Sequence, residues 1–233
     1  MKLDICIPAY NEEAIIVETS QAVKDALTAL SLENRIVVAS NGSTDRTVSR
    51  AREAGFEVMM VPLRGKGAAV VAAAKASTAE LFGFIDADLS ADPADIEKLL
   101  SRIVNGECDV AIGSRLLDTR SVERQILRTF SSRVFNALRR LLLGIAVEDT
   151  QCGLKLMNEK GRRVLAQCKE EGWFFDMEFL ARCEKEGLCI QEVPIRWREH
   201  YYPGRTSHLR MIRDGFGALL AMWRIRKTLR TRS

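Results

Sequence analysis

Short apolar runs alternate with amphipathic segments along the first half of the chain. The apolar runs, rich in β-branched and aromatic residues, predict strands at residues 3–9, 35–40, 57–62, 81–86 and 109–113. Helical periodicity or strong helix formers predict helices between them, at residues 12–30, 45–54, 67–77 and 94–103. This alternation is typical of β-α-β units and predicts an α/β fold with a mainly parallel central sheet flanked by helices. In such sheets, functional side chains collect at the carboxyl ends of the strands.

The second half of the chain is less regular. Its apolar spacing predicts helices at residues 125–143, 161–168, 176–186 and 208–230. Two further runs predict strands at residues 148–157 and 189–197. The sequence contains no internal repeat and no linker composition. We therefore expect one domain at residues 1–207 and a basic amphipathic C-terminal helix at residues 208–233.

The composition narrows the class of protein. With 233 residues, of which 47% are hydrophobic and 28% charged, the chain can bury one substantial core, which excludes a disordered or collagen-like protein. No uncharged apolar run reaches the ~18 residues of a membrane-spanning helix, and the first residues do not resemble a secretory signal, so we expect a cytoplasmic protein. The six cysteines are scattered without a C-x-x-C pair, which favours buried, reduced thiols over a zinc site or disulfides.

Positive charge is concentrated at the end of the chain. Residues 205–233 contain eight lysines and arginines against one acidic residue, although the whole chain carries a net charge of only +4. The body before them is therefore slightly acidic. A basic tail on an acidic body favours partners that carry phosphate or an anionic lipid surface.

Polar segments follow the first two predicted strands, and two interpretations of each stay open. The segment at the end of the first strand contains Pro8, Tyr10, Asn11 and Glu12. It either binds a nucleoside through an aromatic ring and polar groups or forms a turn capped by Asn11. Ser40 and Asn41 end the second strand in a segment rich in turn and capping residues, so a role at the edge of a nucleotide rests on position alone.

Lys66 lies between two glycines after the third predicted strand, ahead of an alanine-rich helix. The segment lacks the spacing of a Walker A loop. Either the glycines let backbone N–H groups approach a phosphate, or they form a plain turn.

The sharpest pattern follows the fourth predicted strand, where Asp86, Ala87 and Asp88 come directly after an apolar run. On an extended chain, residues i and i+2 face the same side, so the two carboxylates are expected to converge. Adjacent carboxylates repel unless a cation lies between them, and such oxygen ligands suit Mg²⁺ or Mn²⁺ holding a diphosphate. The alternative is a solvated turn that caps the next helix.

Charged residues also follow the fifth predicted strand and precede the next one. Arg115 would lie beside the expected phosphates. Further along, Glu148 and Asp149 place two carboxylates near another strand edge.

Together and in this order, these motifs resemble the family 2 glycosyltransferases of the GT-A fold, and within them the polyprenyl-phosphate hexose synthases that use dolichyl phosphate. The resembling segments are residues 7–13, 41–47, 65–67, 86–90, 113–115 and 149–157. The resemblance implies an inverting, metal-dependent transferase that moves a hexose from UDP-glucose or GDP-mannose to a polyprenyl or dolichyl phosphate. It also implies Mg²⁺ or Mn²⁺ as cofactor and a peripheral position on the cytoplasmic face of a membrane.

The resemblance further implies roles for individual residues. Those expected to bind the nucleotide sugar are Pro8, Tyr10, Asn11, Glu12, Ser40, Asn41, Lys66, Asp86, Ala87, Asp88 and His208. The expected metal ligands are Asp86, Asp88 and Ser90. The expected catalytic residues are Asp88, Arg115 and Asp149. The residues expected to hold the acceptor phosphate are Arg128, Ser132 and Arg205.

The chain departs from the family's pattern at several of these positions. Ser40 and Asn41 stand where many relatives have two acidic residues, which leaves the base unidentified. Ser90 replaces the glutamine of mannose-type relatives, and His200 and His208 stand where those relatives have arginine and lysine. The segment at residues 149–155 favours the glucosyltransferase branch.

The implied reaction is an in-line displacement. A metal at Asp88, with Lys66 and Arg115, would stabilise the departing nucleoside diphosphate. An acceptor phosphate has a second pKa of about 6 and is largely a dianion at neutral pH, so the reaction needs no dedicated general base. Arg128 and neighbouring arginines would position it.

The C-terminal helix and the remaining alternatives complete the expectations. Its apolar stripe comprises Leu209, Ile212, Phe216, Leu219, Leu220 and Trp223. This stripe either lies on an anionic membrane, packs on the protein's own body, or receives a small membrane subunit or a second copy of the chain. The alternative functions are a family 2 transferase with a non-lipid acceptor, a sugar-1-phosphate nucleotidyltransferase, and an inactive domain with a basic anchor. We do not expect a nucleic-acid partner.

Overall fold

The computed structural model describes residues 1–30, 32–117, 139–198 and 211–230. Its strands are β1 (Lys2–Ala9), β2 (Glu33–Ser40), β3 (Glu57–Met60), β4 (Leu81–Phe84), β5 (Val110–Ser114), β6 (Lys155–Asn158) and β7 (Ile190–Pro194). Its helices are α1 (Ile16–Thr28), α2 (Thr47–Glu53), α3 (Lys66–Ala76), the 3-10 turn η1 (Pro93–Asp95), α4 (Ile96–Val104), α6 (Glu159–Leu165), α7 (Phe175–Lys185) and α8 (Met211–Arg230).

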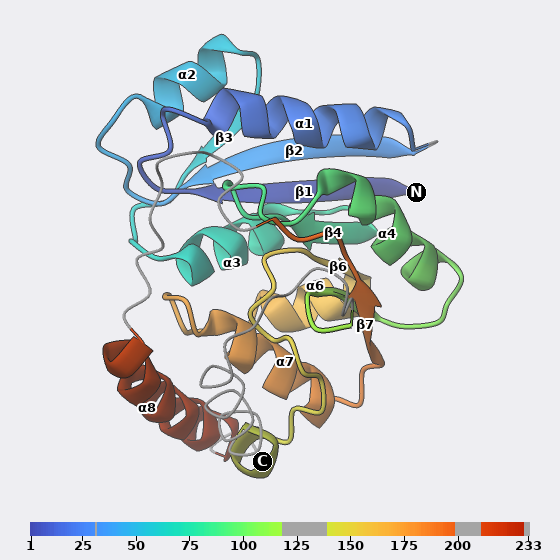
Figure 1. Ribbon diagram of the computed structural model, residues 1–233, viewed down its shortest axis with the longest axis vertical. Helices are drawn as coiled ribbons and strands as arrows, with labels where there is room; N and C mark the ends of the chain where they lie inside the picture. The colour runs from blue at the N-terminus through green and yellow to red at the C-terminus, as the bar shows by residue number, and fades with distance from the viewer. Residues whose placement is uncertain (31, 118–138, 199–210, 231–233) are drawn as a thin grey trace.

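The described strands form one sheet in the order β3-β2-β1-β4-β6-β5-β7 (Figure 1). Strands β1 to β4 run parallel to their neighbours and β7 runs parallel to β5, which confirms the mainly parallel sheet. Strand β6 is antiparallel to both β4 and β5. Because of this reversal, its first residue, Lys155, pairs with Phe84 and Ile112 near the ends of β4 and β5. The segment before Lys155 therefore reaches the end of the sheet where the parallel strands finish, here named the carboxyl end.

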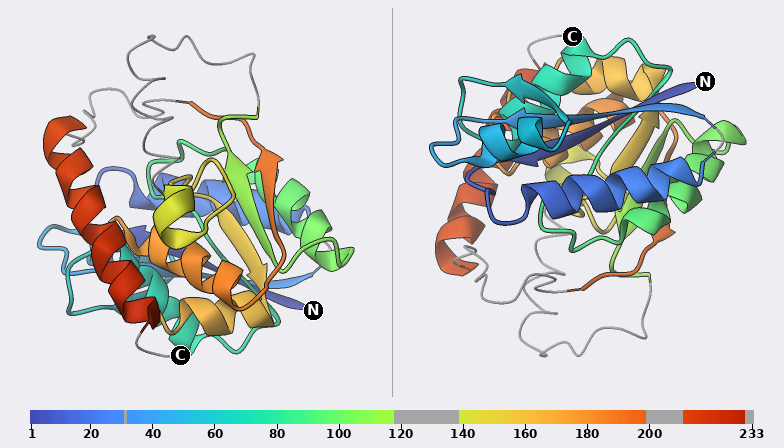
Figure 2. Two further views of the ribbon diagram at one scale, coloured as in Figure 1. Left: turned by 90° about the horizontal axis from the view of Figure 1, so that it is seen from below. Right: turned by 90° about the horizontal axis from the view of Figure 1, so that it is seen from above.

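Helices cover both faces of the sheet. Figure 2 shows α1 and α4 on one face and α3, α6 and α7 on the other. Helix α4 illustrates the sequence logic, since its buried residues Ile96, Leu99, Leu100 and Ile103 follow the i, i+3, i+4 spacing of an amphipathic helix. Helix α3 is built mainly of alanine and valine, and most of its residues are buried. Small side chains on all sides let this helix lie close to both the sheet and its neighbours.

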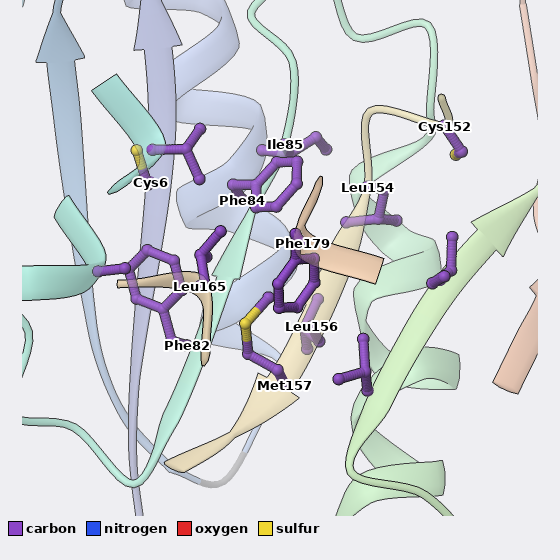
Figure 3. Packing of buried hydrophobic residues seen from close by; sticks show 14 of the residues in the cluster. Cys6, Phe82, Phe84, Ile85, Cys152, Leu154, Leu156, Met157, Leu165 and Phe179 are labelled. Carbon is purple, nitrogen blue, oxygen red and sulfur yellow. The ribbon is translucent and has the colours of Figure 1, made fainter. Parts of the chain in front are cut away.

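The core is densest around β4 and β6 (Figure 3). Phe82 and Phe84 of β4 lie near Leu156 of β6 and Phe179 of α7, all of them buried. The ring of Phe84 is 5.6 Å from that of Phe175, centroid to centroid. Burying each such side chain contributes about 1.5–3 kcal/mol, so the strand that precedes the two aspartates is firmly held.

Most predicted elements are present, with shifted ends. The helix expected at residues 12–30 begins only at Ile16, because the backbone N–H groups of Glu12 and Glu13 bond the Thr47 hydroxyl and the Asp45 carboxylate at 2.7 and 3.0 Å. The strand expected at residues 148–157 is confined to β6, and only residues 139–143 of the helix expected at 125–143 are described, as helix. Five of the six cysteines are buried, as expected, whereas Cys189 is exposed.

Helix α8 lies beside α7, away from the sheet (Figure 1). Its buried residues are Ala221, Met222 and Ile225. Leu219, Leu220 and Trp223 are exposed, with Trp223 at 63%. The C-terminal helix thus packs one apolar face on the body and turns a second one outward, so two of the alternatives for this helix each describe one of its faces. Among the described helices, none combines the length and apolar character that crossing a bilayer requires.

Candidate active site

Lys66 and Asp86 form an ion pair at the carboxyl end of the sheet. Lys66 opens α3 and Asp86 lies two residues beyond β4, and Lys66 Nζ lies 2.7 Å from Asp86 Oδ1. The lysine side chain is 8% exposed and the aspartate 22%. The rings of Phe84, Trp173 and Phe175 have their centroids 5.5–5.7 Å from Nζ. The pair is therefore fixed among aromatic rings with one open side.

The pair's electrostatics reflect this burial. Burial raises the pKa of the Asp86 carboxyl, and the nearby Asp88 charge adds to that effect, although Lys66 opposes it. Burial lowers the pKa of Lys66, but the charge of Asp86 outweighs it, and the lysine's pKa ends above its usual value. A carboxylate pulled both ways gains from any further cation beside it, so the pair favours a bound cation.

The two glycines around Lys66 admit protein backbone. Gly65 has a φ of +129°, and a Cβ placed there would lie 2.1 Å from the Glu171 carbonyl oxygen. A Cβ on Gly67 would lie 2.4 Å from the Glu170 carbonyl oxygen, and Ala68 donates its N–H to Glu171 at 3.0 Å. The first turn of α3 is thus covered by residues 170–171. Between the two interpretations left open for this segment, the structure favours a close-packed turn over a backbone cradle for phosphate.

Asp88 is the exposed carboxylate of the pair predicted after β4. Its Oδ1 accepts the N–H of Ser90 at 3.0 Å, and the intervening Leu89 has a φ of +51°. Ala87 is buried, and its carbonyl accepts the Thr19 hydroxyl at 2.6 Å. β4 ends at Phe84, two residues earlier than predicted, so a tight turn and not an extended strand sets the two carboxylates. They are nonetheless neighbours, as expected.

Arg115 and Asp149 form the second ion pair at this end of the sheet. Arg115 follows β5, and its Nε and Nη2 donate to the two Asp149 oxygens at 2.7 and 2.6 Å. The Arg115 backbone N–H adds a third bond at 2.9 Å. Burial raises the pKa of Asp149, but these bonds and the arginine's charge outweigh it and hold the pKa below its usual range. The Trp197 ring centroid lies 4.7 Å from the guanidinium carbon, so an aromatic face and a carboxylate orient this cation.

The ends of β1 and β2 form the wall beside these pairs. Pro8 and Ser40 are buried within their strands, and Asn41 is buried just beyond β2. Tyr10 is 39% exposed, with the Arg64 guanidinium 5.1 Å from its ring centroid. A partly exposed tyrosine beside a buried amide keeps a nucleoside role open.

The loops after β1 and β2 are tied to each other. Asn11 has a φ of 55°, and its Oδ1 accepts the N–H of Thr44 at 2.8 Å. The proposed capping of the first helix by Asn11 is wrong, because α1 has no side-chain cap.

Some predicted residues lie outside the part of the chain that the structure describes. These residues are Arg128, Ser132, His200, Arg205 and His208. Their assignments to the acceptor phosphate and to the nucleotide sugar stay predictions.

Sequence reasoning missed a buried ion pair behind the site. Lys155 Nζ lies 2.6 Å from Asp176 Oδ1, and the two side chains are 0% and 1% exposed. Lys155 also donates to the Cys152 carbonyl at 2.7 Å and lies 5.3 Å from the Phe84 ring centroid. The signal was a lysine within an apolar strand, since lysine is almost never buried without a partner. Glycine packs here too, because a Cβ on Gly153 would lie 2.2 Å from Asp86 Oδ2.

Comparison with known proteins gives a consistent result. Residues 4–164 match the family described as glycosyl transferase family 2. Glycosyltransferase AglD of Haloferax volcanii is 29% identical over 96% of this chain, which spans 37% of that protein's length. The dolichyl-phosphate beta-glucosyltransferase of Drosophila melanogaster is 31% identical over 97% of this chain and 78% of its own length.

Among solved structures, the chain resembles glucosyl-3-phosphoglycerate synthase from Mycobacterium tuberculosis in complex with Mn²⁺ and UDP-glucose. The TM-score is 0.70 at 24% identity, over 95% of this chain and 78% of that one. At this identity the likeness concerns the fold, and it confirms the expected GT-A architecture.

Proposed function

Because the chain belongs to glycosyl transferase family 2, we propose that it moves a hexose from a nucleoside-diphosphate sugar to a polyprenyl or dolichyl phosphate, with inversion at the anomeric carbon. The family match sets aside the nucleotidyltransferase and the inactive-domain alternatives. The observation that carries the proposal is the meeting of two cation–carboxylate pairs and the exposed Asp88 at one end of the sheet. Similarity to dolichyl-phosphate beta-glucosyltransferases supports the lipid phosphate as acceptor and favours UDP-glucose as donor.

A divalent cation fits this site when the donor supplies part of its ligands. Asp88 offers an exposed carboxylate of the hard-oxygen type that Mg²⁺ and Mn²⁺ prefer, next to Asp86 and Ser90. Within the described residues, no cluster of three acidic, histidine or cysteine side chains is placed to hold a metal alone. Mg²⁺ is often bound by one or two carboxylates plus substrate phosphates, which matches this donor set. A cation held there would neutralise charge on the departing diphosphate. The solved neighbour crystallised with Mn²⁺ and UDP-glucose supports this choice.

The chain's own cations provide the remaining stabilisation. Lys66 is enclosed and already oriented by Asp86, and Arg115 by Asp149, so neither side chain must reorganise when negative charge develops. Tyr10 and Asn41 would hold the nucleoside beside them. An acceptor phosphate needs no general base, because its dianion predominates at neutral pH. Positioning of the acceptor is thus the main task left for the protein.

The outward face of α8 supports a peripheral position on the cytoplasmic face of a membrane. Trp223 and two leucines, Leu219 and Leu220, are exposed there, and Lys227 lies beside the Trp223 ring at 5.6 Å from its centroid. An exposed aromatic–leucine face edged by basic side chains suits the interface of an anionic bilayer. A small membrane subunit and a second copy of the chain stay predictions.

The test is a transfer assay on the purified protein with polyprenyl phosphate in vesicles and labelled UDP-glucose or GDP-mannose. We expect metal-dependent label in the lipid from one donor. Asp88→Ala should lower the rate on the order of 10³-fold, because metal stabilisation of several kcal/mol is lost. Glu80→Gln is the matched control, since Glu80 is an exposed carboxylate just before the opposite end of β4. Nucleotide release without lipid label would exclude the lipid acceptor and favour a non-lipid one.

A further inference from the structure

A carboxylate outside the site holds the turn that presents Asp149. Glu192 lies on β7, where it pairs with Ile112 of β5. Its Oε2 accepts the backbone N–H of Glu148 at 2.7 Å, and its Oε1 accepts that of Asp149 at 2.9 Å. Two successive N–H groups bound to one carboxylate leave that stretch of backbone little freedom, because charge-assisted bonds are about twice as strong as neutral ones.

The carbonyl groups of the same turn are held from the other side. Arg139 is fully buried, and its guanidinium donates to the carbonyls of Val147 and Glu148. Burial lowers the pKa of Arg139, and the negative charge of Glu192 opposes that effect. A buried cation binds the carbonyls and an anion binds the N–H groups, so the turn is fixed by two opposite charges that also stabilise each other.

The turn in turn fixes the direction of Arg115. Every printed polar contact of the Arg115 guanidinium is with Asp149, at 2.6 and 2.7 Å, and Trp197 covers its flat face. The fixed guanidinium leaves its remaining N–H groups at the carboxyl end of the sheet. If the backbone of Asp149 shifts, the cation shifts with it, and a displacement of 1 Å at a reacting centre can lower a rate by about 100-fold.

We infer that Glu192 is a positioning residue for the transfer reaction, acting on Arg115 through the backbone of Asp149. It touches neither the donor site nor the Lys66–Asp86 pair. The inference rests on the proposed function for the identity of the reaction. Its geometry rests only on contacts between β7 and the turn at residues 147–149.

The matched control is Glu184, whose Oε1 accepts the N–H of Ala146 at 3.0 Å. This carboxylate binds the same turn three residues earlier, without reaching Asp149. Glu192→Gln should lower kcat by about 10–100-fold and leave KM for the nucleotide sugar within about twofold, because orientation and not donor binding is lost. Glu184→Gln should leave both constants unchanged.

Coupling separates positioning from general destabilisation. In an Arg115→Ala background, Glu192→Gln should cause no further loss of kcat, since the cation it positions is gone. Losses that multiply, or a raised donor KM with kcat unchanged, would overturn the inference. Glu192→Asp retains the charge on a shorter arm and should fall between wild type and Glu192→Gln, which keeps the series readable if the Gln variant folds poorly.

Amide hydrogen exchange tests the contact without any turnover. Glu192→Gln should speed exchange at Glu148 and Asp149 and not at Ala146, whereas Glu184→Gln should do the reverse. Unchanged exchange at Glu148 and Asp149 would overturn the inference. A wild-type protein that releases nucleotide without labelling lipid would instead exclude the proposed acceptor, and the Glu192 effect would then be measured on nucleotide release.

Discussion

The two halves of the sheet hold their loops with different chemistry. Beyond β1 and β2, short polar side chains and backbone groups join the loops, as Thr47 does when its hydroxyl accepts the N–H of Glu12 at 2.7 Å. Around β5, β6 and β7, buried charges do so: Arg115 pairs with Asp149, and Lys155 with Asp176. The nucleoside side is thus held by nearly neutral contacts, and charge is concentrated where phosphates are expected to react.

This difference sets how each half responds to substitution. A neutral hydrogen bond contributes about 0.5–1.5 kcal/mol, whereas removing one partner of a buried ion pair costs about 3–5 kcal/mol because an uncompensated charge is left behind. The second half of the sheet should therefore be the more sensitive to single changes and the more tolerant of paired ones.

The largest effect on stability should follow Lys155→Met. It leaves Asp176 buried without its cation and should lower the free energy of unfolding by about 3–5 kcal/mol. Lys155→Met with Asp176→Leu should recover most of that loss, and Thr47→Val on the other side should cost about 1 kcal/mol. Urea denaturation measures all three. Equal losses for Lys155→Met and Thr47→Val would remove the contrast between the halves.

Gly65→Ala tests the cover over α3. The new Cβ would lie 2.1 Å from the Glu171 carbonyl, at a φ of +129°, so we expect a loss of about 2–4 kcal/mol in the free energy of unfolding. Gly55→Ala is the control, because Gly55 also has a positive φ, +82°, but no atom within 4 Å of its added Cβ. It should cost about 1–2 kcal/mol from the backbone alone. If the two variants lose the same amount, residues 170–171 do not press on α3 in solution.

The pH dependence of stability should differ in sign between the two site carboxyls. The pKa of Asp149 lies below its unfolded value of about 3.9, so its stabilising contribution is present above that pH and is lost as the pH falls further. Asp149→Asn should therefore lose stability less steeply than wild type below about pH 4, by at most about 1.4 kcal/mol per pH unit.

Asp86 should behave in the opposite way. Burial raises its pKa in the folded state, so wild-type stability gains a contribution as the pH falls through that raised pKa toward about 3.9. Asp86→Asn should remove this gain. Denaturation curves of both variants and wild type at a series of pH values measure the slopes, and parallel slopes for the two variants would contradict the opposite shifts.

The smallest effect should come from the ion pair that joins α8 to the body. Arg224 donates to Glu170 at 2.9 and 3.0 Å, but the arginine is 56% exposed. Screening by water limits such a pair to about 0.2–1 kcal/mol, so Arg224→Ala should barely change the melting temperature. A loss comparable to that of Gly65→Ala would mean that α8 is attached chiefly by charge and not by Ala221, Met222 and Ile225.

Local signals explain which parts of the fold could be predicted. Strands β1 to β5 are continuous apolar runs flanked by turn residues, so their existence and approximate position follow from the sequence. The direction of β6 does not, because nothing within Lys155–Asn158 specifies which neighbour it pairs with. That direction depends on long-range pairing with β4 and β5.

The same distinction applies to the site. Its location follows from the polar residues at the strand ends, and the neighbourhood of Asp86 and Asp88 follows from their spacing. The partners of these residues do not, since Lys66, Arg115 and Glu192 find their carboxylates or amides across 20 to 44 residues of sequence. Charged residues alone do not specify such pairings, and the covering of α3 by residues 170–171 leaves no pattern beyond the two glycines.

The reversed strand β6 makes the fold modular. β5 finishes and β6 starts at the same end of the sheet, as adjacent strands, so residues 115–154 leave and re-enter it at neighbouring points. The free energy of closing such an excursion grows only slowly with its length, and changes within it leave the strand register intact. Evolution can therefore rewrite this one insertion to exchange acceptors, while the strands that hold the nucleotide are inherited unchanged.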